Sequence, residues 1–290
     1  YDNFSPHEDI ISDRLSVLNA LAKNPRVICI ASAANLSHRL APKEAIIGTA
    51  FDWHLGQTID IAQQRRQLES AGYRTTDTVY QHGEFAVRGS ILDIFPMGSE
   101  QPVRVDLFDE DIESIRYFDP ETQRSGEPIQ RITLLPGREV PLTETGIARF
   151  RQAFRERFAA DFSRCRTYTE VSEGIAPGGI EYFLPLFYER TDSFWDYLPE
   201  QALVAHQTTL VSELDRFWQE VESRYENRRH DITQPILTPR ELFTPSDEVF
   251  ARLNQFRRLS LSTSPVREQS GHLNLSTESP ADYPVDHRAQ

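Results

Sequence analysis

Residues 84–119 read EFAVRGSILDIFPMGSEQPVRVDLFDEDIESIRYFD, and their alternation predicts three or four short strands joined by turns. In residues 103–108 the alternation sets three aliphatic side chains on one face of a strand and Arg104, Asp106 and Phe108 on the other. The aliphatic face fits a core. The opposite face combines a guanidinium group, a carboxylate and a large aromatic ring, a mixture that a solvated face does not need.

The preceding segment predicts a second arginine on the same face. Ala86, Arg88 and Ser90 share one side, so we expect Arg88 to be the cross-strand neighbour of Arg104. The pattern loosens at Gly89, which predicts a bulge. Two arginines beside an exposed phenylalanine are typical of a protein-recognition hot spot. The alternative interpretation is an Arg–Asp cross-strand pair on a solvated sheet.

Composition limits the class of protein. A length of 290 residues favours two or three domains, and 39% hydrophobic residues support real cores. A net charge of −13 argues against nucleic acid as the main partner. Cys29 and Cys165 show no metal or redox spacing, which fits a reducing cytoplasm, and no apolar run has the length of a membrane span. Because the chain starts at Tyr1 in the middle of a pattern, we expect an excerpt of a longer protein.

Upstream, the sequence predicts an α/β unit. A capping box starting at Ser5 opens a helix with an apolar stripe as far as Leu21, and residues 27–31 follow as a buried strand. This order indicates part of a parallel sheet whose other strands are partly missing. The pair His7 and Glu8 is explained by the helix cap rather than by a metal site.

Downstream, we expect a polar helix near 61–70 that ends at Gly72, and closure of the strand-rich module near 131–135. The acidic residues 109–111 fit a charged hairpin turn rather than a calcium loop. A helix at 145–162 carries a phenylalanine stripe, which predicts a core-facing helix, with a nucleic-acid-binding helix as the alternative. Further expectations are strands at 202–205 and 259–261, a helix at 210–228, and a polar tail from Ser264.

Catalytic motifs are missing where they are expected. Neither lysine, Lys23 or Lys43, sits in a phosphate-binding loop, and there is no nucleophile elbow or His-Glu-x-x-His helix. After the strand at 202–205 comes the segment 206–208, His-Gln-Thr, where a nucleotide hydrolase of this layout would carry an acidic pair that binds magnesium. We therefore expect no nucleotide hydrolysis and no metal site.

Five strings carry a family resemblance in collinear order. They are YDNFSPHEDIISDRL (1–15), the stretch 83–125, GIEYFLPLFY (179–188), FWDYLPEQALVAH (194–206) and ESRYENRR (222–229). They resemble the amino-terminal region of the bacterial transcription-repair coupling factors (the Mfd family) and, more distantly, the excision-repair subunit UvrB. The resemblance covers almost everything from Tyr1 to about Leu261.

The resemblance implies an α/β fold with three units and a tail. Residues 1–47 and 198–263 would form a degenerate helicase-type (RecA-like) parallel-sheet domain, 48–135 an inserted β-rich domain that binds UvrA, 136–197 a small third subdomain, and 264–290 a linker or tail. Family residues that contact UvrA fall on Arg88, Arg104 and Phe108, and less securely on Arg74. Ala86 replaces an arginine of UvrB, and the turn at 5–11 is too short for the DNA-inserting hairpin of UvrB.

By the same resemblance, this excerpt is a non-catalytic, UvrA-recruiting module without a cofactor. The parent would be an ATP- and magnesium-dependent translocase on double-stranded DNA that removes stalled RNA polymerase in the bacterial cytoplasm. Its carboxy-terminal domain would cover the UvrA-binding face until the motor engages. The alternatives are a helicase or nuclease subunit of a repair complex, and a DNA-binding module that uses the arginines of 149–157.

Overall fold

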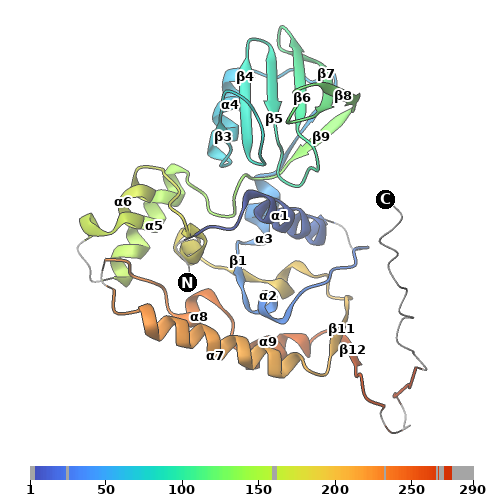
Figure 1. Ribbon diagram of the computed structural model, residues 1–290, viewed down its shortest axis with the longest axis vertical. Coiled ribbons are helices and arrows are strands. Elements are labelled where there is room, and N and C mark those ends of the chain that lie inside the picture. Colours follow the sequence, from blue (N-terminus) through green and yellow to red (C-terminus); the bar gives the residue numbers. More distant parts are fainter. Residues whose placement is uncertain are drawn as a thin grey trace, which may run out of the picture.

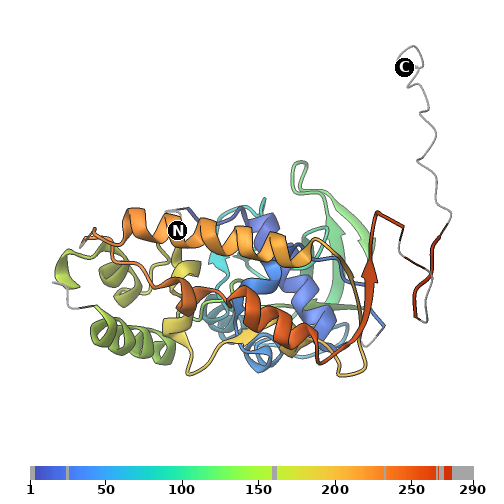
Figure 2. The same cartoon turned by 90° about the horizontal axis from the view of Figure 1, so that it is seen from below.

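The structure is a computed structural model that describes residues 4–23, 26–158, 162–231, 233–265, 267 and 271–275. In Figure 1 a β-rich part stands above a mostly helical part, and the long helix α7 (Leu210–Arg228) runs along the lower edge of the helical part. Figure 2, seen from below, shows α9 (Ser246–Leu253) beside α7. The coarse prediction of a mixed α/β protein is confirmed. Most of the expected tail lies outside the described residues.

Helix α1 (Glu8–Lys23) lies directly below the β-rich part (Figure 1). The predicted apolar stripe is confirmed, because Leu15, Leu18 and Leu21 are buried. The predicted cap is wrong in detail: the hydroxyl of Ser5 donates to Glu181, and the carbonyl of His7 accepts the first helical hydrogen bonds. The helix therefore begins two residues after the proline.

Short elements surround α1 in the helical part. They are α2 (Ala33–Ser37), α3 (Lys43–Gly48), β1 (Arg39–Leu40) paired antiparallel with β10 (Asp192–Ser193), the 3-10 helix η3 (Phe194–Tyr197) and α8 (Pro239–Leu242). Trp195 and Tyr197 of η3 are buried, and the hydroxyl of Tyr197 donates to the carbonyl of Ala41. Residues 45–47, a short apolar run, lie within α3.

The predicted parallel sheet is present only as two strands. β11 (Leu203–Gln207) pairs parallel with β12 (Arg257–Leu261), and both are largely exposed. The prediction of a buried strand at 27–31 is wrong: this segment is not a strand, and Ile28 and Ile30 are 95% and 96% exposed. Aliphatic composition favours burial, but a strand also needs a hydrogen-bonded neighbour, and none of the described residues pairs with this segment.

The small unit on the left of Figure 1 is helical. It contains α5 (Glu144–Arg157), η1 (Phe162–Arg164), α6 (Arg166–Ser172) and the 3-10 helix η2 (Ile180–Phe187). The core-facing phenylalanine stripe is confirmed, because Phe150 and Phe154 are fully buried and pack against rings of η2. The helix ends at Arg157, five residues earlier than expected.

The β-rich part contains a six-stranded sheet with the order β3-β4-β5-β6-β7-β8. The strands are β3 (Arg74–Thr75), β4 (Glu84–Arg88), β5 (Ile91–Ile94), β6 (Val103–Phe108), β7 (Asp111–Phe118) and β8 (Ser125–Pro128). β3 and β4 are parallel, and the other neighbours are antiparallel. Three or four strands were expected in residues 84–119, and the structure has four, β4 to β7.

One face of this sheet forms the core of the β-rich part. Its aliphatic residues cluster with Trp53 of β2 (Phe51–His54), which pairs with β9 (Arg131–Leu134), and with Leu68 of α4 (Ile61–Ser70). The predicted polar helix and the predicted closing strand are thus both confirmed. On the opposite face a small cluster of Val79, Ala86, Phe95 and Phe118 covers only part of the sheet. The rest of that face is left to polar side chains.

Polar contacts join the sheet to α1. The hydroxyl of Ser12 accepts from the backbone N–H of Gly98 at 2.8 Å, and Nδ1 of His82 lies 2.7 Å from Oδ1 of Asp9. Gly137 sits so close to the backbone of Gly72 that a Cβ there would lie 2.6 Å from a carbonyl carbon. The contacts of Ser12 and Asp9 hold the sheet against α1.

Candidate functional site

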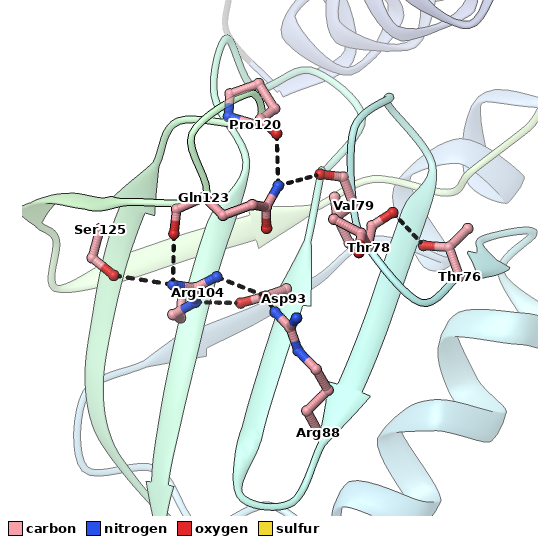
Figure 3. A network of polar contacts seen from close by, with 9 residues as sticks. All are labelled: Thr76, Thr78, Val79, Arg88, Asp93, Arg104, Pro120, Gln123 and Ser125. Carbon is pink, nitrogen blue, oxygen red and sulfur yellow. Dashed lines mark hydrogen bonds and ion pairs between the residues drawn. The ribbon is translucent and has the colours of Figure 1, made fainter.

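A buried carboxylate organises the polar face of the sheet. Asp93 on β5 has no solvent exposure and stands between β4 and β6. Its oxygens accept from Nε of Arg104 at 2.7 Å, from Nη2 of Arg104 at 2.9 Å, and from Nη2 of Arg88 (Figure 3). One carboxylate therefore orients two guanidinium groups. We call the face that carries Arg88, Asp93, Arg104, Asp106, Phe108 and Arg116 the arginine face.

All three nitrogens of the Arg104 guanidinium donate hydrogen bonds, and the group also lies over an aromatic ring. Its Nη1 donates to the carbonyl of Gln123 at 3.1 Å and to the hydroxyl of Ser125 at 3.4 Å (Figure 3), and its guanidinium lies 4.8 Å from the ring centre of Phe118. Hydrogen bonding to Asp93 raises the pKa of the Arg104 guanidinium above its ordinary value. With all three nitrogens engaged and the side chain only 16% exposed, Arg104 is mainly an internal tie between β6 and the turn before β8.

Arg88 and Phe108 form the accessible part of the arginine face. The side chain of Arg88 is 49% exposed, and only Nη2 contacts Asp93. Phe108 is 69% exposed, whereas its neighbour Leu107 is buried, so the predicted alternation along β6 holds to the end of the strand. A guanidinium group with two nitrogens that are unpaired within the described part of the chain, and an exposed aromatic ring, can both contact a partner protein.

The structure corrects the predicted neighbourhood of Arg88. Arg88 and Arg104 are not cross-strand neighbours, because β5 runs between their strands and Asp93 bridges them. Residues 89 and 90 form a two-residue hairpin turn instead of a bulge, with Gly89 at a φ of 62°. A register shift does occur later, in β7 opposite Asp106 and Leu107.

Arg74 does not join the other candidates. It lies on the edge strand β3 and pairs with Glu84, at the opposite end of β4 from Arg88. Burial raises the pKa of Glu84, but the N–H groups of Tyr80 and Gln81 and the guanidinium of Arg74 outweigh burial, and the net pKa is lowered. Arg74 is therefore part of a local ion pair at the base of the sheet.

The sequence interpretation missed Asp93 and Arg116. Arg116 on β7 lies directly opposite Arg104 and is exposed. A usable signal was present, because Gly89-Ser90 is a dipeptide typical of a two-residue hairpin. Counting strand register from that turn places Asp93 opposite Ala86 and Arg104.

A second candidate region is a cavity of about 700 Å³ at the junction of the sheet, α1 and η2. Its wall includes the ion pair of Arg14 with Glu139, and neither lysine of the chain lines it. Within the described ranges, no group of three or more His, Cys, Asp or Glu side chains could hold a metal ion. Nor is any helix there long and apolar enough to cross a membrane.

Comparison with known proteins identifies the class of the β-rich part. Residues 51–139 match the UvrB interaction domain family, a range that begins at β2 and contains the whole six-stranded sheet. The arginine face therefore lies in the part of the chain that matches the UvrB interaction domain family.

Relatives extend the similarity to almost the whole chain. Transcription-repair-coupling factors are 41% identical in Haemophilus influenzae over 95% of this chain and 39% identical in Escherichia coli over 98% of it. The Bacillus subtilis factor is 28% identical over 75%. The chain spans about a quarter of the length of the first two relatives (24% and 25%). The resemblance expected from the sequence is confirmed: the chain is a homologue of one segment of the transcription-repair-coupling factors.

Proposed function

We propose that this chain is the UvrB-like, UvrA-recruiting module of a transcription-repair coupling factor. Such a module links removal of stalled RNA polymerase to nucleotide excision repair. The observation that carries the proposal is the coincidence of the UvrB interaction domain match, residues 51–139, with the sheet that presents Arg88 and Phe108. A role in bacterial DNA repair implies a cytoplasmic protein.

The recruiting surface uses each of the sequence candidates differently. Arg88 keeps Nε and Nη1 for a carboxylate of UvrA, since only its Nη2 contacts Asp93. Phe108 supplies an apolar anchor on the same face. Arg104 supports binding from within the sheet, because its nitrogens already have partners. Arg74 contributes least, since it lies at the far end of β4.

The test is a calorimetric titration of the protein with purified UvrA. Reversing the charge of a desolvated arginine typically costs about 2 kcal/mol or more, so Arg88→Glu should weaken binding by roughly thirtyfold or more. The matched control is Arg66→Glu, the same charge change at an exposed position of α4. Circular dichroism checks folding. Wild-type affinity in a folded Arg88→Glu variant refutes the proposed surface.

The other domains of the proposal rest on the resemblance. Residues 1–47 and 198–263 form the degenerate helicase-type domain, 48–135 the UvrA-binding domain, 136–197 the small subdomain, and 264–290 the linker. The module itself is non-catalytic and needs no cofactor. ATP and magnesium, double-stranded DNA and RNA polymerase engage other parts of the full-length protein, whose carboxy-terminal domain covers the arginine face before activation.

Two alternative functions receive less support. The DNA-binding alternative needs free arginines on α5, and two of the four arginines of this helix are already in ion pairs, Arg149 with Glu189 and Arg157 with Glu241. The helicase or nuclease alternative needs nucleotide binding, which a titration with ATP and magnesium measures directly. Heat released on saturable ATP binding favours that alternative.

A further inference from the structure

Arg116 is an exposed cation on β7, at the opposite side of the arginine face from Arg88 on β4. It lies directly opposite Arg104 in the antiparallel pair of β6 and β7, so the two side chains project from the same face. Its neighbour on the other side is Pro128 of β8, which carries no charge. Within the described residues, no hydrogen bond or ion pair involves the Arg116 guanidinium.

The two carboxylates of the arginine face, Asp93 and Asp106, already accept hydrogen bonds from other side chains. Asp93 is shared by Arg88 and Arg104, and Asp106, diagonal to Arg116 across β6 and β7, accepts from the hydroxyl of Ser114 at 2.8 Å. Like charges directly opposite on a sheet are destabilising. Folding therefore gains nothing from a second arginine beside Arg104, whereas an acidic partner would supply the missing counter-charge.

We propose that Arg116 is a further partner-binding residue of the arginine face and pairs with a carboxylate of UvrA. This inference rests on the proposed function and extends the recruiting surface across the sheet. β4 and β7 are three strand spacings apart, about 14 Å across the sheet, and Arg116 lies two residues along β7 from Ser114, the residue level with Arg88. A surface of that width fits within one standard protein interface.

The experiment titrates UvrA into wild type, Arg116→Ala and Arg116→Glu, with Arg66→Glu as the control of equal charge change. Leu68 of α4 packs in the core on the other face of the sheet, so Arg66 lies away from the arginine face. We expect roughly tenfold weaker binding for Arg116→Ala, a larger loss for Arg116→Glu, and no change for Arg66→Glu. Thermal unfolding provides a second readout. Because Arg116→Glu removes a like-charge pair, its Tm should equal or exceed that of wild type.

The outcomes separate this inference from the proposed function. If wild type fails to bind UvrA, the proposed function is refuted, and the proposed role of Arg116 is refuted too. If wild type binds, Arg88→Glu does not, and Arg116→Glu binds like wild type, only the role of Arg116 is overturned. Equal losses in Arg116→Glu and Arg66→Glu also overturn it, because they indicate a general charge effect. A Tm below that of wild type contradicts the like-charge argument.

Discussion

Replacing Asp93 with alanine tests whether the buried carboxylate organises the arginine face. The substitution removes the acceptor of two hydrogen bonds from Arg104 and of one from Arg88. Arg104 cannot move freely into solvent, because Gln123 and Ser125 hold its Nη1. The result is a guanidinium group that remains largely buried beside Arg116 and has lost the carboxylate that binds it, with only the weaker attraction of Asp106 left.

The loss of folding stability in Asp93→Ala depends on how exposed Arg88 and Arg104 are. Removing one partner of a buried ion pair typically destabilises a protein by about 3–5 kcal/mol. Arg104, at 16% exposure, falls under this rule, whereas Arg88, at 49%, regains water and adds little. We therefore expect Asp93→Ala to lower the free energy of unfolding by about 3 kcal/mol, a large fraction of a typical stability of about 5–15 kcal/mol.

Urea unfolding followed by circular dichroism measures this change. Asp106→Ala is the matched control, because Asp106 lies on the same face but accepts one hydrogen bond, from Ser114, and forms no ion pair with an arginine among the described residues. We expect a loss of about 1 kcal/mol or less there. The double variant Asp93→Ala/Arg104→Met should recover much of the lost stability, because both charges are then gone. Equal, small losses in Asp93→Ala and Asp106→Ala would refute the role of Asp93.

Three further changes test other parts of the structure. Phe108→Ala should leave Tm unchanged, since the ring is 69% exposed, yet weaken UvrA binding at least tenfold by calorimetry; unchanged affinity would exclude the ring as an anchor. Gly137→Ala should destabilise the protein by about 1–3 kcal/mol in thermal unfolding, because its Cβ would meet the backbone of Gly72; a wild-type Tm would mean that the two segments separate easily. Burial, the main cause, lowers the pKa of His38 to about 4, so the unfolded chain binds a proton between about pH 6.5 and 4 while the folded chain does not. Stability should therefore fall as the pH drops through this range, and less steeply in His38→Gln; parallel urea midpoints for the two proteins would contradict this.

Alternation along single strands was predictable from the sequence, because it depends only on the backbone. The period of two placed Arg104 and Phe108 on one face and Leu107 on the other, as the structure has them. Which residues of different strands are neighbours was not predictable from alternation alone. Because a bulge was predicted at Gly89 in place of a hairpin turn, β5 was not recognised as a separate strand between β4 and β6. Arg88 was therefore expected beside Arg104, and Asp93 was given no role.

The prediction that residues 27–31 are buried failed for a related reason. The aliphatic run at 27–31 has the composition of a core strand, and Ile28 and Ile30 are nevertheless exposed. Composition reports which residues gain from burial, but another element must cover them. The phenylalanine stripe of α5 met this condition, because rings of η2 pack on Phe150 and Phe154. The same type of pattern therefore succeeded where a partner element was present.

The arginine face carries exposed arginines of two kinds, which the sequence pattern could not distinguish: Arg88 is already held by Asp93, and Arg116 is not. A long side chain loses rotamer freedom when it binds a partner, at a cost of about 0.5–1.5 kcal/mol, and a prior contact reduces that cost. Asp93 holds Nη2 of Arg88, so this side chain is partly ordered before the proposed binding of UvrA, and Arg104 keeps Asp93 in place. Arg116 has no such contact, so its pairing must supply the full cost of ordering. Arg88 should consequently contribute more to affinity than Arg116, although both carry the same charge on the same face.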